Sequence, residues 1–150
     1  MKEHRKEGSM KRLFYFNILL VFLVVCACSH SVFYYSKYGD IDGVKPFVEK
    51  GDIHRANSYG FTPLLIATYY GHTGLVKYLA ENGADVNRQD NRGWTSLMYA
   101  AYYNHKDIAK ILLEHNASVT IKNSEGKTAL DYAEEANSGN LLDLLKKERT

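Results

Sequence analysis

The sequence repeats itself with a period of 33 residues, and this period constrains the fold more than any other feature. Residues 60–64 read GFTPL, residues 93–97 read GWTSL, and residues 126–130 read GKTAL. A second motif recurs with the same period, since GADV at 83–86 returns as NASV at 116–119. Fixed periods of about 20 to 50 residues indicate stacked repeats, in which neighbouring units bury a common core.

Each unit is predicted to contain two short helices joined by a tight turn. Thr62 suits the N-cap of the first helix because its hydroxyl can accept a bond from a free backbone N–H. Pro63 suits the first helical position, where no N–H is needed. The apolar residues between 75 and 79 have the i, i+3, i+4 spacing of one buried helix face. Gly71 and Gly83 follow the two helices, where the chain often takes a positive φ.

The pattern G-x-T-P-L, then A-T-Y-Y-G-H, then L-V-x-Y-L-x-x-x-G-A-D-V-N resembles the ankyrin repeat from about residue 31 to the end. The resemblance implies an all-α solenoid of about four helix-turn-helix units with loop fingers between them. The expected units are a degenerate repeat at 31–56, followed by 57–89, 90–122 and 123–150. In the first unit we expect an irregular turn at Pro46, because proline removes a helical hydrogen bond.

Residues 1–28 predict export. A basic flank precedes an almost unbroken apolar run at 13–25, and small residues follow, as in a secretory signal. The basic flank predicts that the repeats lie on the far side of the membrane. The segment Val25–Cys28 resembles the bacterial lipobox, which implies that Cys28 is lipidated and becomes the new N-terminus.

Three fates of this segment remain open: a lipoprotein signal, a signal peptide cleaved without lipid, or an apolar anchor that is retained. Translation can also start at Met1 or Met10. In each case we expect an exported protein at a cell membrane, in the periplasm or on the outer membrane face. Both cysteines of the chain, Cys26 and Cys28, lie here, so the repeats are expected to hold together without disulfides.

Charge and motifs argue against several classes of function. Residues 1–27 hold 5 Lys or Arg and 2 Asp or Glu, so their removal leaves 14 against 15 and a net charge of −1. This balance gives no electrostatic footprint for nucleic acid. His72 and His105 recur with the repeat and are interpreted as turn residues, and Asp85 and Asp90 as loop-stabilising carboxylates. We find no nucleophile motif, phosphate loop or metal-ligand spacing, and therefore predict no catalytic residue, metal or cofactor, and no enzyme.

The most informative surface feature is aromatic. In ankyrin proteins the concave face is lined by the finger tips and by outer positions of the first helix. Carried over residue by residue, the resemblance predicts these partner-binding residues: Tyr38, Tyr59, Phe61, Tyr69, Tyr70, Arg92, Trp94, Tyr102 and Tyr103. Trp, Tyr and Arg dominate interface energetics. An alternative is that Phe61 and Trp94 pack against the helices.

The sequence therefore predicts a protein–protein binding module whose partner it does not identify. Two other roles are compatible with it: an accessory protein of a periplasmic enzyme or envelope complex, or an effector directed at a host.

Overall fold

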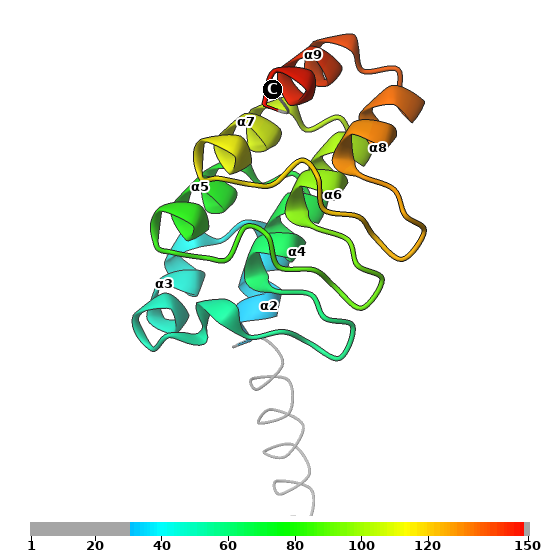
Figure 1. The fold of residues 1–150 in the computed structure, drawn as a ribbon. Coiled ribbons are helices and arrows are strands. Elements are labelled where there is room, and N and C mark those ends of the chain that lie inside the picture. Colours follow the sequence, from blue (N-terminus) through cyan, green and yellow to red (C-terminus); the bar gives the residue numbers. More distant parts are fainter. Residues whose placement is uncertain (1–30, 149–150) are drawn as a thin grey trace, which may run out of the picture.

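The computed structural model describes residues 31–148. They form four pairs of helices stacked side by side in two layers (Figure 1). The first helices of the pairs lie beside the loop fingers: α2 (Val32–Tyr38), α4 (Pro63–Tyr69), α6 (Ser96–Tyr102) and α8 (Ala129–Glu135). The second helices form the other layer: α3 (Ile41–Glu49), α5 (Thr73–Glu81), α7 (Lys106–Glu114) and α9 (Gly139–Lys147). A 3-10 turn, η1 (Asp52–His54), follows α3.

Each predicted unit contains one of these helix pairs. The residue boundaries of the units remain a prediction. The described residues contain helices, turns and loops but no strand. The all-α repeat architecture expected from the period is therefore confirmed.

The first helices α4, α6 and α8 follow capping threonines, as predicted for Thr62, whereas α2 follows the capping residue Ser31. The Oγ1 atoms of Thr62 and Thr95 accept bonds from the backbone N–H three residues later, each at 3.3 Å. Pro63 occupies the first helical position of α4. At α8 the side chain of Asp131 also accepts a bond from the backbone N–H of Thr128, which completes a capping box. The bonds that Asp131 accepts from the backbone N–H and the hydroxyl of Thr128 lower the pKa of the Asp131 carboxyl.

His72 and His105 are the N-cap residues that precede the second helices α5 and α7. The Nε2 atom of His72 lies 2.7 Å from the carbonyl oxygen of Lys37 in the preceding pair. Its ring packs so closely on Gly39 that a Cβ there would lie 2.8 Å from the imidazole. His72 thus joins neighbouring pairs, and its interpretation as a structural turn residue is confirmed.

The core lies between the two layers and continues from pair to pair. Leu65, Leu79, Leu112 and Leu145 are fully buried in it, one or two from each of the last three pairs. Ala67 is also fully buried, which allows neighbouring helices to approach closely. Most of the apolar face predicted for each helix is therefore buried, as stacked units require.

The expectation of an irregular turn at Pro46 was wrong, since α3 continues through it. Proline removes the bond to the carbonyl of Asp42, four residues earlier. Both residues are exposed, so water can satisfy that carbonyl. The cap of α3, in which Asp40 accepts a bond from the N–H of Gly43 at 2.9 Å, holds the first turn in place.

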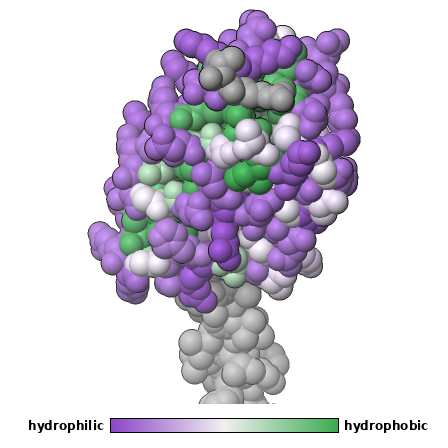
Figure 2. Space-filling model, in the orientation of Figure 1, coloured by the Kyte–Doolittle hydropathy of each residue, from purple (hydrophilic) through white to green (hydrophobic). Residues whose placement is uncertain are grey.

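Cys28 and the predicted export segment 1–28 lie outside the described residues. Among residues 31–148, no helix has the length and apolar character needed to cross a bilayer. Hydrophilic side chains cover most of the face seen in Figure 2, with apolar patches between them.

Candidate functional site

Each finger is closed by one polar side chain at its first residue. Asn57 Oδ1 accepts bonds from the backbone N–H groups of Tyr59 and Phe61, at 2.9 and 3.0 Å. Asp90 and Asn123 make the same pair of bonds, 33 and 66 residues later. We call these loops the second (57–61), third (90–94) and fourth (123–127) fingers. The role of Asp90 as a loop-stabilising carboxylate is confirmed, whereas sequence reasoning missed Asn57 and Asn123 despite their spacing.

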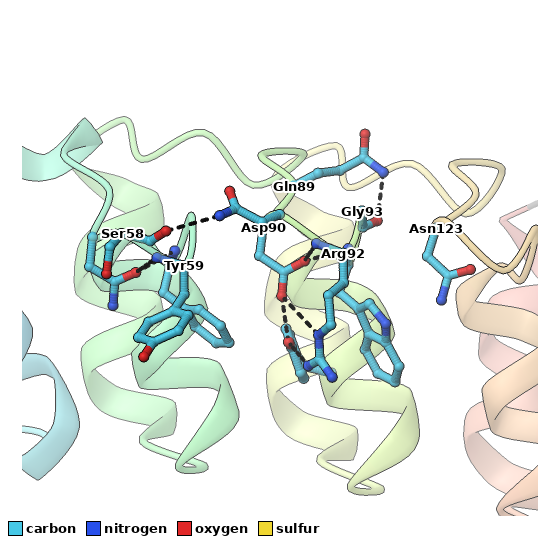
Figure 3. Close-up of polar contacts among 12 residues, drawn as sticks. Ser58, Tyr59, Gln89, Asp90, Arg92, Gly93 and Asn123 are labelled. Carbon is cyan, nitrogen blue, oxygen red and sulfur yellow. Dashed lines mark hydrogen bonds and ion pairs between the residues drawn. The ribbon is translucent and has the colours of Figure 1, made fainter.

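Neighbouring fingers are joined by hydrogen bonds (Figure 3). The backbone N–H of Asn91 donates to the carbonyl of Tyr59 at 3.1 Å, and its side-chain amide donates to the carbonyl of Ser58 at 3.0 Å. The N–H of Ser124 donates to the carbonyl of Arg92 at 3.0 Å. The fingers therefore form one connected row, which fixes the spacing of the side chains that they carry.

A buried polar network ties the third finger to α6. Tyr99 donates its hydroxyl to Asp90 Oδ2 at 2.6 Å, and Arg92 Nη2 donates to the Tyr99 oxygen at 2.8 Å. Asp90 is only 6% exposed. Burial, and next the bond to Asp90, raise the pKa of Tyr99 well above its ordinary value. The pKa of Arg92 is also raised, chiefly by its bond to Tyr99. Asp90, Tyr99 and Arg92 therefore satisfy one another's hydrogen-bonding groups, and the Asp90 carboxylate is not free to act as a general base.

Ring contacts connect the last three helix pairs. The ring centroids of Phe61 and Tyr99 lie 5.7 Å apart, those of Tyr99 and Trp94 4.8 Å, and those of Trp94 and Tyr132 4.4 Å. Such contacts between aromatic rings are favourable beyond the area they bury. Sequence reasoning missed Tyr99 and Tyr132, although their separation of 33 residues is visible in the sequence.

Trp94 lies beneath the surface and not on it. It is 8% exposed and packs against Tyr99, Tyr102 and Tyr132. Phe61 is partly buried. The alternative that these two residues pack against the helices therefore holds, completely for Trp94 and in part for Phe61. Trp94 supports the rings above it from the inside.

Seven large apolar side chains of the described residues are exposed, and all are tyrosines. We call them the tyrosine face: Tyr34, Tyr38, Tyr59, Tyr69, Tyr70, Tyr102 and Tyr103. Six of them were predicted as contact residues. Tyr34, in the same degenerate unit as Tyr38, was not predicted; its ring centroid lies 4.8 Å from that of Tyr38.

The tyrosine face is continuous across three helix pairs. Tyr69 contacts Tyr70 and Tyr103, with ring centroids 5.1 and 5.2 Å apart, and Tyr103 contacts Tyr102 at 5.0 Å. The Lys37 ammonium lies 5.7 Å from the ring centroid of Tyr70 and 5.6 Å from that of Tyr38. Burial, and next its contact with Tyr69, raise the pKa of Tyr103 to about 12. The Tyr103 hydroxyl therefore stays neutral at physiological pH and can both donate and accept hydrogen bonds.

An open groove of about 500 Å³ lies at one end of this face, between α2 and the second finger. Its aromatic walls are Phe33, Tyr34, Tyr59, Phe61, Tyr69 and Tyr70. Lys37, Asn57, Ile66 and Arg92 complete it. Predominantly apolar walls with a few placed polar groups are typical of binding sites in proteins.

Comparison with known families agrees with this architecture. The sequence matches the family described as ankyrin repeats (3 copies), over residues 32–123 and again over 93–149. The protein belongs to the ankyrin-repeat family. A search among curated proteins finds no match. Ankyrin repeats are generally protein–protein interaction modules, and typically not enzymes.

The exposed groups of the ankyrin stack are of the kinds that contact a protein partner. Within residues 31–148, no three His, Cys, Asp or Glu side chains are placed to hold a metal ion. The exposed groups of the tyrosine face are aromatic rings and phenol hydroxyls, bordered by Lys37 and Arg92. Such a face can provide contact area, hydrogen bonds and cation–π contacts to a partner.

Proposed function

We propose that this ankyrin-repeat protein binds a protein partner through its tyrosine face after export, while held at a bacterial membrane. The observation that carries the proposal is the continuous set of exposed tyrosines above a packed layer of rings. Tyrosine offers a large contact area with little conformational entropy to lose. Because Trp94 and Tyr99 support the exposed rings from below, further ordering on binding is small, which favours affinity.

Site-specific photo-cross-linking in the producing bacterium tests which face binds. A photoreactive phenylalanine analogue replaces Tyr70 or Tyr102 on the tyrosine face, or Lys110 on the exposed side of α7 as the matched control. We expect one discrete adduct from the first two positions and none from Lys110. Equal adducts from all three positions, or none from Tyr70 and Tyr102, would contradict the proposal.

Once that partner is purified, the double variant Tyr102→Ala/Tyr103→Ala measures the contribution of the face. A tyrosine that acts as a hot spot contributes about 2 kcal/mol, so affinity should fall about 30-fold if one of the two is a hot spot and about 1,000-fold if both are. Thermal unfolding should change little, because both side chains are exposed. The exposed Lys110→Ala variant is the control for both measurements.

The membrane part of the proposal rests on the basic, apolar and small-residue order of the N-terminal segment and on the lipobox-like sequence ending at Cys28. Intact mass of the chain recovered from membranes tests it. We expect a chain that begins at Cys28 and carries acyl groups, and no such species from Cys28→Ser. An unmodified chain with another N-terminus, or the intact precursor, would contradict lipidation.

A further inference from the structure

The three first helices that follow a finger, α4, α6 and α8, differ at one position that faces the fingers. Ile66, Tyr99 and Tyr132 occupy the fourth residue of α4, α6 and α8. In the third pair, the hydroxyl of Tyr99 donates to Asp90 at 2.6 Å. In the fourth pair, the side-chain amide of Asn123 donates to the hydroxyl oxygen of Tyr132 at 2.7 Å. A phenol ring therefore fills the space between finger and helix in two pairs out of three.

In the second pair this ring is missing, and the groove lies in its place. Ile66 and Asn57 both line the groove. Asn57 keeps the two backbone bonds of its finger, but its side-chain NH₂ has no hydrogen-bond partner among the described residues. Phe61 contacts the rings of Tyr99 and Tyr69 and also lines the groove. The aromatic layer thus stops at Phe61, beside an unpartnered amide donor.

The charge of the groove has one sign. Lys37 and Arg92 line it, and none of its other lining residues is charged. Lys37 forms no ion pair with any described residue, and its ammonium lies over two tyrosine rings. The Arg92 guanidinium has a long contact with Asp90, at 4.0 Å. Two cations beside an apolar groove, of which Lys37 has no ion pair with a described residue, favour a partner segment that carries carboxylates.

We infer that this groove is the anchor pocket of the tyrosine face and that it takes a tyrosine of the partner protein, flanked by acidic residues. The inference rests on the proposed function and names the segment that it recognises. The ring lies against Phe61 in the space that Tyr99 and Tyr132 fill in the later pairs. The side-chain amide of Asn57 donates to its phenol oxygen, as Asn123 does to Tyr132, and the flanking carboxylates face Lys37 and Arg92.

An NMR titration of the full chain tests this directly. The probe is a capped peptide with one Tyr between two Glu-Asp pairs, added up to millimolar concentration. A bound ring should shift the δ1-methyl signal of Ile66 by its ring current. The methyl of Ile111, in the other layer on α7, is the internal control and should not move. An unmoved Ile66 signal, or equal shifts at both methyls, would overturn the inference.

Three matched peptides define the occupant, with affinities measured by fluorescence polarisation. Replacing the Tyr by Phe should weaken binding about fivefold, the loss of one neutral hydrogen bond. Replacing it by Ala, or the acidic flanks by Lys, should weaken binding about tenfold or more. Equal affinity of the Lys-flanked peptide would contradict the assignment of an acidic segment.

Two variants separate the groove from the rest of the surface. Ile66→Tyr introduces the ring found in the next two pairs and should weaken peptide binding about tenfold or more while the fold is kept. Asn57→Asp retains the finger bonds, as Asp90 does in the next finger, and should repel the acidic peptide to a similar extent. Thermal unfolding of both variants checks folding, and unchanged affinity in folded variants overturns the inference.

Failure of this inference is distinguishable from failure of the proposed function. If Ile66→Tyr leaves the cross-link from Tyr102 unchanged, the partner binds the tyrosine face without using the groove. If Tyr70 and Tyr102 give no cross-link at all, the proposed function itself is wrong. A shift of the Ile66 methyl on raising the concentration of the protein alone would assign the groove to a second copy of this chain, against the inference.

Discussion

The second and third fingers share a backbone and differ in what they enclose. Their turn glycines have φ of 82° and 78°, and each leads through a threonine cap into a seven-residue helix. The third finger encloses a ring and a carboxylate that satisfy each other, whereas the second leaves a groove and an unpartnered amide. The difference shows that caps and turns determine the repeat, while one helix position determines whether a ring fills the space beside the finger or a groove lies there.

The largest expected effect comes from breaking the closed unit. Asp90→Ala removes the acceptor for two backbone N–H groups and for the buried Tyr99 hydroxyl, and should destabilise the fold by about 3–5 kcal/mol. Asn57→Ala should destabilise it by about 1–2 kcal/mol, because water reaches the partly exposed second finger. Urea unfolding at neutral pH measures both.

The control for Asp90→Ala is Asp90→Asn. It keeps the acceptor and can donate to Tyr99, as Asn123 donates to Tyr132, so a loss of only about 1 kcal/mol is expected. Equal losses for Asp90→Ala and Asn57→Ala would show that the two fingers are energetically alike.

A second prediction concerns how the fingers stack. A Cβ on Gly60 would lie 2.7 Å from the backbone nitrogen of Asn91. A Cβ on Gly126, in the fourth finger, would have no neighbouring atom within 4 Å. Both have positive φ, so Gly126→Ala should lose about 1 kcal/mol from backbone strain alone. Gly60→Ala must also separate two fingers and should lose about 2–3 kcal/mol, as measured by thermal unfolding. Losses of equal size would mean that finger contacts contribute little.

A third prediction is a gain in the stability of the fold. The Thr68 hydroxyl is buried without a hydrogen-bond partner in the described residues, and its counterpart in the third pair is the buried Ala101. Thr68→Val keeps the shape and should stabilise the fold by about 1 kcal/mol. The control Thr62→Val removes a capping hydroxyl and should destabilise it by about 1 kcal/mol. A loss of stability in Thr68→Val would indicate that water reaches this hydroxyl.

The repeat itself could be predicted because its determinants are local. The cap at Thr62 and the turns at Gly60 and Gly83 depend on residues only a few positions apart, so the period reveals them directly. The depth of Trp94 could not be predicted in this way, because it depends on Tyr132 in the next pair. The continuity of α3 through Pro46 depended on which side of the helix meets water.

The site was predictable in part for the same reason. Exposed positions follow from alignment of the units, which located six of the seven exposed tyrosines. The groove lies at the position where the second unit has Ile66 and the later units have a tyrosine. In the sequence, isoleucine at position 66 is indistinguishable from a residue of the buried helix face. Only the packed neighbours show that a groove lies beside Asn57.

The smallest expected effect concerns His105, one of the two histidines that join the pairs. His105 packs on Gly71, where a Cβ would lie 3.0 Å from its Cε1, and burial lowers the pKa of the His105 imidazole. Because this pKa is lower in the folded than in the unfolded state, the unfolded chain binds the proton first as the pH falls. The stability associated with neutral His105 is therefore complete above about pH 6.5 and declines as the pH falls through the folded pKa.

Urea midpoints between about pH 7.5 and 5 measure this decline. The wild type should lose more stability over this range than His105→Gln, and His54→Gln, which replaces an exposed histidine, is the matched control. Carboxylates titrate in all three proteins, so only the difference between them reports on His105. Parallel curves for all three would mean that His105 is as accessible to protons in the fold as in the unfolded chain, and that its packing on Gly71 does not exclude its charged form.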